Sequence, residues 1–152
     1  MGTLAATAWA SAGALPGGAS LGMNEAELRA SVGALERVSK PTRLVGGLAG
    51  LWSATSEIGG RRMMTTYFFA REKLERVEYT YAAEDSGAAY EDVLTWARRH
   101  WGSEMLSRGP EADYASWTDA GTDVYLQFST NARGKLVRLV VKPRVLKEAS
   151  EL

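Results

Sequence analysis

The sequence predicts an α+β fold in which two tandem α-β-β-β units form one antiparallel sheet, with two helices packed on one face. The first observation is the Arg61–Tyr81 stretch, where two runs rich in β-branched and aromatic residues flank the polar tetrad at 70–73. Successive side chains of a strand point to opposite faces, so these runs are typical of paired strands with one buried and one wetter side.

The second observation is that the two halves of the chain repeat the same order of elements and share residues. The segment Lys73–Val77, KLERV, matches Lys135–Leu139, KLVRL, at an offset of 135 − 73 = 62 residues. Trp52 and Trp117 each fall on the first predicted strand of their half. This pattern indicates an internal repeat, and because one unit alone leaves a sheet face unburied, we expect the two units to join in one two-layer domain.

Composition and charge are those of one ordinary globular domain. The chain has 152 residues, of which 45% are hydrophobic and 24% are charged, and 18 basic residues balance 18 acidic ones. The absence of net charge argues against nucleic acid as a partner. We expect a single domain at 22–145, made of units 22–83 and 84–145, followed by a frayed tail at 146–152.

The first 21 residues differ from the rest because they carry no charge and are rich in Ala, Gly, Ser and Thr. Ala8-Trp9-Ala10 resembles the small-x-small cleavage site of a secretory signal, although a basic leading region is missing. We expect a flexible arm or the remnant of an export signal, and hence a periplasmic or secreted protein, with a cytoplasmic location as the alternative. No apolar run reaches the ~20 residues of a transmembrane segment.

In the first half, Asn24 is a good N-cap for a helix that we expect to end at Lys40-Pro41. A strand at 48–57 follows, and Gly59-Gly60 predicts a hairpin into the Arg61–Tyr81 pair. Apolar residues recur at helical spacing along the predicted helix, namely Leu28, Val32, Leu35 and Val38.

In the second half, a helix is expected at 89–106, and strands are expected at 112–118, 123–130 and 136–142. Pro143 closes the last strand. The predicted buried stripe of this helix is Val93, Leu94, Ala97, Trp101 and Leu106.

The tandem pattern resembles the β-lactamase inhibitor protein fold. Residues 22–28, GMNEAEL, are also similar to the Gly-Met-x-x-x-x-Val/Leu opening of the small outer-membrane lipoproteins of the SmpA/OmlA (BamE) group. Two features depart from that group: Ser39-Lys40-Pro41 stands where Gly-x-Pro is common, and no lipid-attachment cysteine is present. The resemblance implies an exported binding or assembly protein rather than an enzyme.

The residues that carry chemistry are few. There is no cysteine and a single histidine, His100, so we expect no thiolate or multi-histidine metal site. The acidic pairs Glu84-Asp85 and Glu91-Asp92 flank a predicted helix start, where capping and the helix dipole favour acids. We therefore expect no catalytic residue, no metal and no cofactor.

Aromatic and arginine side chains on the sheet face away from the helices are the strongest functional feature, because interfaces with proteins are enriched in both. The favoured hypothesis is a domain that binds another protein through this face. Two alternatives stay open, a homodimeric cytoplasmic secretion chaperone or adaptor, and a carrier of a small ligand with a pocket between the layers. The candidate binding residues are Trp52, Phe68, Arg76, Glu78, Trp117, Tyr125, Gln127 and Arg138.

Overall fold

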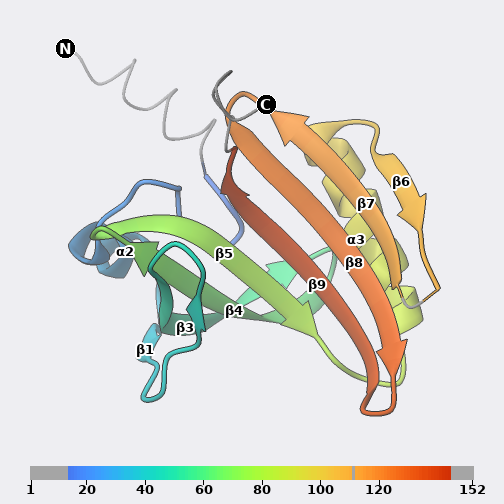
Figure 1. The fold of residues 1–152 in the computed structure, drawn as a ribbon, viewed down its shortest axis with the longest axis horizontal. Coiled ribbons are helices and arrows are strands. Elements are labelled where there is room, and N and C mark those ends of the chain that lie inside the picture. Colours follow the sequence, from blue (N-terminus) through green and yellow to red (C-terminus); the bar gives the residue numbers. More distant parts are fainter. Residues whose placement is uncertain (1–13, 111, 145–152) are drawn as a thin grey trace.

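The computed structural model of the protein describes residues 14–110 and 112–144. Over these residues the chain forms two helices and one antiparallel sheet of nine strands, which confirms the α+β prediction (Figure 1). The helices are α2 (Glu25–Ser31) and α3 (Ser86–Trp101). The strands are β1 (Glu36–Arg37), β2 (Arg43–Leu44), β3 (Leu48–Ile58), β4 (Arg61–Ala70), β5 (Lys73–Tyr81), β6 (Met105–Arg108), β7 (Ala112–Asp119), β8 (Thr122–Asn131) and β9 (Gly134–Pro143).

The sheet joins the two halves of the chain through their last strands. Its strand order is β1-β3-β4-β5-β9-β8-β7-β6, with β2 pairing with β3 beside β1. The chain runs through β3, β4 and β5 as consecutive hairpins and does the same through β7, β8 and β9, so that β5 meets β9 at the centre. Figure 1 shows the strong twist that separates the green half from the orange half.

Two tight turns fix the register of the first half. Gly59 and Gly60, both with positive φ, connect β3 to β4, as predicted. The turn from β4 to β5 is shorter than the predicted tetrad, because Ala70 pairs directly with Lys73 and only Arg71 and Glu72 form the turn. Both turn residues adopt positive φ, of 50° and 66°, which is the conformation that a two-residue hairpin requires.

The first helix is much shorter than predicted. Asn24 forms a capping box with Glu27, as its N-cap role requires, and Leu28 is fully buried. The helix then ends at Ser31, and Ala34 has a positive φ of 55°. Leu35 and Val38 therefore leave the helix, and the chain turns into β1 instead of continuing to Lys40.

The second helix is shifted relative to the prediction. It begins at Ser86 and ends at Trp101, where Gly102 adopts a positive φ of 86° and its N–H bonds to the carbonyl of Arg98. Val93, Leu94 and Ala97 are buried, as expected. Its spacing predicts that Leu106 belongs to the helix, but Leu106 lies on β6.

The core lies between the helices and the face of the sheet that they contact, here called the helix-side face. Its largest fully buried side chains include Tyr67, Val77, Leu126 and Leu139, and Leu28 of α2 and Val93 of α3 belong to the same cluster.

Part of the N-terminal segment also packs on this core. Ala19 is fully buried, and Tyr79 donates its hydroxyl hydrogen bond to the carbonyl of Pro16 at 3.0 Å. The flexible arm was predicted for residues 1–21; residues 1–13 lie outside the described residues, whereas 14–21 pack against the sheet. The predicted tail at 146–152 also lies outside the described residues.

Candidate functional site

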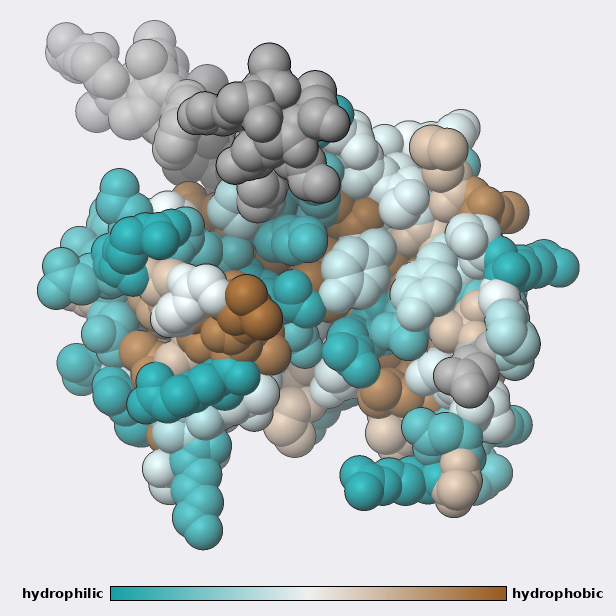
Figure 2. Space-filling model, in the orientation of Figure 1, coloured by the Kyte–Doolittle hydropathy of each residue, from teal (hydrophilic) through white to brown (hydrophobic). Residues whose placement is uncertain are grey.

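The opposite face of the sheet, here called the open face, has no helix of the described residues packed on it and is turned toward the viewer in Figure 1. Its residues follow from the register, because side chains of directly paired residues lie on the same face. One row runs through Glu78, Val140 and Tyr125, and the next runs through Arg138 and Gln127 to Tyr114. Figure 2 shows this face, on which pale and teal side chains cover the central strands.

Most of the predicted binding residues lie on the open face, on four neighbouring strands. Phe68 of β4 pairs with Arg76 of β5, and Gln127 of β8 pairs with Arg138 of β9. Phe68 is buried, however, so its ring is not presented to a partner. The predicted residues found here are Phe68, Arg76, Glu78, Tyr125, Gln127 and Arg138.

Trp117 is the first correction, because it lies on the helix-side face. It pairs with Val124, which belongs to the core, and its side is set by the β7–β8 turn at Ala120-Gly121. Trp117 is only 5% exposed, and its indole Nε1 donates a hydrogen bond of 2.9 Å to the carbonyl of Gly102. Trp117 therefore connects the end of α3 to the sheet, and it cannot contact a partner on the open face.

Trp52 is the second correction, because it also lies on the helix-side face, opposite Tyr67. Its indole Nε1 donates a 2.8 Å hydrogen bond to the carboxylate of Glu25 at the start of α2. The guanidinium of Arg37 lies 5.2 Å from the centre of the ring, within the range of a cation–π contact. Trp52 therefore connects α2 and β1 to the sheet.

The centre of the open face is a polar network around Arg76. Its Nε lies 2.7 Å from the carboxylate of Glu78 on the same strand, and its Nη2 donates a 3.0 Å hydrogen bond to the hydroxyl of Tyr125. The side chains of Arg76 and Glu78 are each 15% exposed, so this ion pair is screened less than a surface pair. The network spans β9, where Val140 lies in the row between Glu78 and Tyr125 and is fully buried.

A hollow of about 300 Å³ lies beside this network, between the β2–β3 hairpin and the strands β5 and β9. Arg76 lines it, so the hollow and the polar network share a residue. Val45 at the tip of the hairpin is 96% exposed, and Figure 2 shows an apolar brown patch at the position of this hairpin. The hollow is lined by Val45, Gly46, Leu48, Arg71, Glu75, Arg76, Lys142 and Pro143.

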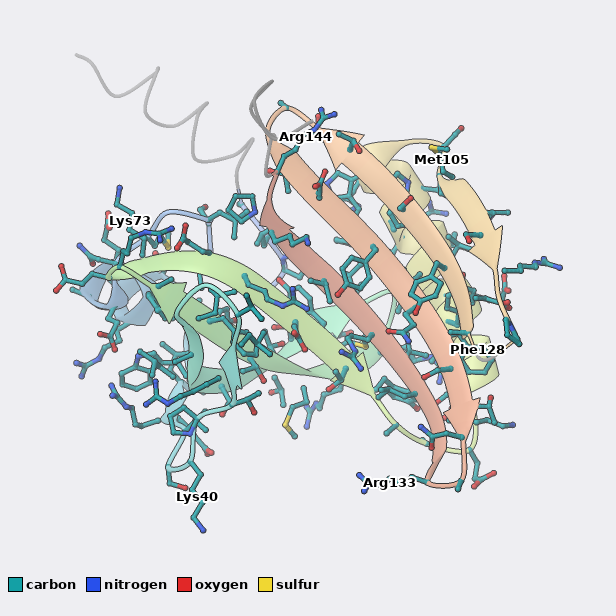
Figure 3. The ribbon with its side chains drawn as sticks, viewed as in Figure 1. Lys40, Lys73, Met105, Phe128, Arg133 and Arg144 are labelled. Atoms are coloured by element: carbon teal, nitrogen blue, oxygen red, sulfur yellow. The ribbon has the colours of Figure 1, made fainter. Side chains whose placement is uncertain are left out.

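Val45 was missed by the sequence prediction, although a signal for it was present. The run Leu44-Val45-Gly46-Gly47 places an apolar residue directly before two glycines with positive φ, of 85° and 77°, which is typical of a hairpin tip. An apolar side chain at such a tip has no neighbouring strand to cover it. Figure 3 shows this hairpin among the side chains of the open face.

One member of each predicted carboxylate pair has a structural role. Asp85 and Asp92 both bind Arg61, at 2.6 and 3.0 Å, and thereby hold the β3–β4 hairpin against α3. His100 stacks on Trp96 with 3.8 Å between the ring centres. Among the described residues, no group of three His, Cys, Asp or Glu side chains is placed to hold a metal ion.

Comparison with known proteins gave no match: no protein-family model, no curated protein and no solved structure is significantly similar to this chain. The similarity to the β-lactamase inhibitor protein and BamE groups therefore stays a prediction. No helix within the described part of the chain is long and apolar enough to cross a membrane.

Proposed function

We propose that this protein is a non-enzymatic binding domain that holds another protein on the open face of its sheet. The observation that carries the proposal is the position of Arg76, which lines the hollow beside the hairpin and also bonds to Glu78 and Tyr125. Arginine and tyrosine are the side chains that most often dominate the binding energy of protein interfaces.

The network supports binding because it holds its side chains in place before a partner arrives. Arg76 is fixed by two hydrogen-bond partners on two different strands, so fewer rotamers are lost when a partner covers it. Gln127 and Arg138 lie in the neighbouring row and offer additional donors and acceptors. A rigid aromatic and guanidinium centre with polar neighbours matches the composition of a protein-binding surface.

Val45 supplies an apolar anchor at the margin of this surface. Its side chain projects from the hairpin tip and is almost fully exposed, so a partner that covers it gains the free energy of removing this apolar surface from water. The partner that fits is a protein with an apolar pocket for Val45 and hydrogen-bonding groups opposite Tyr125 and Gln127. We include in the proposal an exported or envelope-associated location, which rests on the residues around Ala8-Trp9-Ala10 and on the resemblance of residues 22–28.

The experiment is affinity capture from an envelope extract of the source organism with the full chain as bait, followed by quantification of the retained proteins. Variants Tyr125→Ala and Val45→Ser should each reduce the retained partner at least about tenfold, as loss of an interface anchor does. Arg99→Ala is the control, because Arg99 is an exposed residue of α3, on the other side of the sheet. Capture of the same partner by all four proteins, or capture of none while the baits remain folded, would contradict the proposal.

A further inference from the structure

The strand β6 is the free edge of the sheet on the side of the second half. Among the residues that the structure describes, β6 pairs with β7 alone, and all four residues of β6 are exposed. Two of them are large and apolar: Met105 is 77% exposed and Leu106 is 58% exposed. Natural proteins protect such edges with short strands, charged side chains, proline or a bulge; β6 is only four residues long and carries Arg108, but it has no proline and its register with β7 is unbroken.

The register shows which backbone groups of β6 are free. Gly109 donates its N–H to the carbonyl of Ala112, so this pair is hydrogen-bonded, and such pairs alternate along an antiparallel ladder. Leu106 and Arg108 therefore stand in non-hydrogen-bonded pairs with β7, opposite Ala115 and Asp113. Their N–H and C=O groups point away from β7, toward the open edge.

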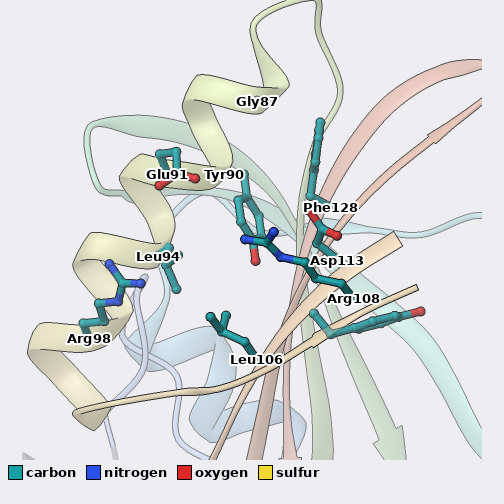
Figure 4. Close-up of a pocket in the computed structure, with 10 residues that line it drawn as sticks. Gly87, Tyr90, Glu91, Leu94, Arg98, Leu106, Arg108, Asp113 and Phe128 are labelled. Atoms are coloured by element: carbon teal, nitrogen blue, oxygen red, sulfur yellow. The ribbon is translucent and has the colours of Figure 1, made fainter. Parts of the chain in front are cut away.

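The side chains of the same two residues enter a cleft. Leu106 pairs with the buried Ala115, which places it on the helix-side face, and both Leu106 and Arg108 line a cleft of about 420 Å³ between β6 and α3. Figure 4 shows Leu94 of α3 and Leu106 on opposite walls of this cleft, with Tyr90 and Phe128 deeper inside. The rings of Tyr90 and Phe128 lie 5.6 Å apart and form an aromatic floor.

The charges along the cleft differ between its two ends. Arg98 is bound by Glu104 at one end, so its charge is already compensated. Arg108 lies at the other end and extends toward Tyr90 in Figure 4. Asp113 lies opposite Arg108 on β7 and also lines the cleft, but no ion pair joins Arg108 to it or to any other residue that the structure describes. Because directly paired residues on adjacent strands are the nearest neighbours, an added strand would place an acidic side chain best opposite Arg108.

We propose that β6 binds an extended peptide segment of another protein as an additional antiparallel strand. The peptide carries an acidic residue opposite Arg108 and an apolar residue opposite Leu106, and the latter packs against Leu106 at the edge of the cleft. An antiparallel strand meets Arg108 before Leu106, so the recognised order along the peptide is acidic, any residue, apolar. Main-chain hydrogen bonds give affinity in this mode and the alternate side chains give specificity. This site is separate from the open face and does not depend on the function proposed for it.

The first test is a pair of synthetic peptides with the same composition and opposite order. One is fluorescein-labelled Ser-Thr-Glu-Thr-Leu-Thr-Ser and the other exchanges its Glu and Leu, and fluorescence anisotropy with the full chain measures both dissociation constants. We expect the first peptide to bind at least about tenfold more tightly, which is the scale of one well-placed charged contact. Equal binding of the two peptides, or no binding of either, overturns the proposal.

The second test uses variants on the two sides of the same strand. Leu106→Pro removes an outward N–H but no hydrogen bond to β7, and it should weaken binding at least about tenfold. Met105→Ala is the control, because Met105 pairs with Ser116 on the other face, and its dissociation constant should stay within about twofold.

Arg108→Glu keeps the test decisive if the proline variant does not fold. This variant should no longer bind the peptide that contains Glu, and it should bind the same peptide with Lys in place of Glu. Unchanged preference for the acidic peptide would overturn the assigned role of Arg108.

Discussion

Arg76 on β5 donates a hydrogen bond from Nη2 to the hydroxyl of Tyr125 on β8, at 3.0 Å, across the intervening strand β9. The contact joins the two halves of the chain on the open face, 49 residues apart in sequence. It passes over the row in which Val140 lies, and Val140 is fully buried although it belongs to an uncovered face. The polar network at the centre of the proposed binding surface thus also covers Val140.

Tyr125→Phe should lower the free energy of unfolding by about 1 kcal/mol, because it removes the acceptor of the Arg76 hydrogen bond and keeps the ring. Urea denaturation measures the change. Tyr114→Phe is the matched control, since no hydrogen bond of its hydroxyl is found within residues 14–110 and 112–144, and it should change stability by about 0.5 kcal/mol or less. Equal effects of the two variants would show that the Arg76 contact does not stabilise the fold.

Trp117→Phe should be the more destabilising substitution, with a loss of about 2 kcal/mol, since it removes a buried hydrogen bond to Gly102 and leaves a cavity beside Trp101. Trp96→Phe is the control, because Trp96 stacks on the exposed His100, and it should cost about 1 kcal/mol or less. Guanidinium denaturation measures both. A Trp117→Phe variant as stable as the original protein would show that Trp117 does not hold the end of α3 on the sheet.

The two glycines of the β3–β4 turn should respond differently to alanine. A Cβ at Gly59 would lie 2.7 Å from the carbonyl oxygen of Asp92 on α3, whereas a Cβ at Gly60 would meet nothing within 4 Å. Both have positive φ, so each substitution costs about 1 kcal/mol of backbone strain, and Gly59→Ala adds a backbone clash of about 1–3 kcal/mol. Thermal unfolding of the two variants gives the comparison, and equal midpoints would show that the hairpin does not dock on α3 at this point.

Asp85 should make stability depend on pH in the acid range. The hydroxyl of Tyr81 and the guanidinium of Arg61 both donate hydrogen bonds to its carboxylate, and these hold the pKa of Asp85 below its ordinary value. A lowered pKa in the folded state stabilises the protein above the ordinary value of about 3.9, and this contribution is lost as the pH falls through the folded pKa.

Asp85→Asn should therefore destabilise the protein at pH 7, and the difference from the original chain should shrink below about pH 4. Urea denaturation from pH 7 to pH 2 measures it. The control is Glu84→Gln, because Glu84 is exposed and forms no ion pair with any described residue, so its effect should be small throughout. A difference for Asp85→Asn that stays constant with pH would contradict this account.

The hairpins of the sheet could be predicted because the residues that specify them are close together in the sequence. The Gly59-Gly60 turn and the alternation in Arg61–Ala70 and Lys73–Tyr81 each specify a hairpin without reference to the rest of the chain. The end of α3 was harder to predict, because Leu106 continues the helical spacing. Only the backbone conformation of Gly102 ends the helix before it.

The face of the sheet on which each of Trp52 and Trp117 lies could not be predicted from composition alone, because it also depends on the strand register. The residues next to Trp117 in the sequence do not indicate which face of the sheet its side chain takes. Its pairing with Val124 places it on the buried face. The cleft beside β6 is a tertiary feature, because it forms only when residues from α3, β6 and β8 meet. The polar network on the open face was predicted as a group of residues, but the contact between Arg76 and Tyr125 depends on the β5–β9–β8 order.

Site-specific photo-crosslinking in the native organism tests the central claim most directly. A benzoylphenylalanine residue replaces Gln127 on the open face in one protein and Arg99, an exposed residue of α3, in another. The proposed function predicts a discrete crosslinked partner for the Gln127 protein that is absent for the Arg99 protein and disappears when Tyr125→Ala is added. A crosslink from Arg99 but not from Gln127, or identical products from both positions, would contradict binding through the open face.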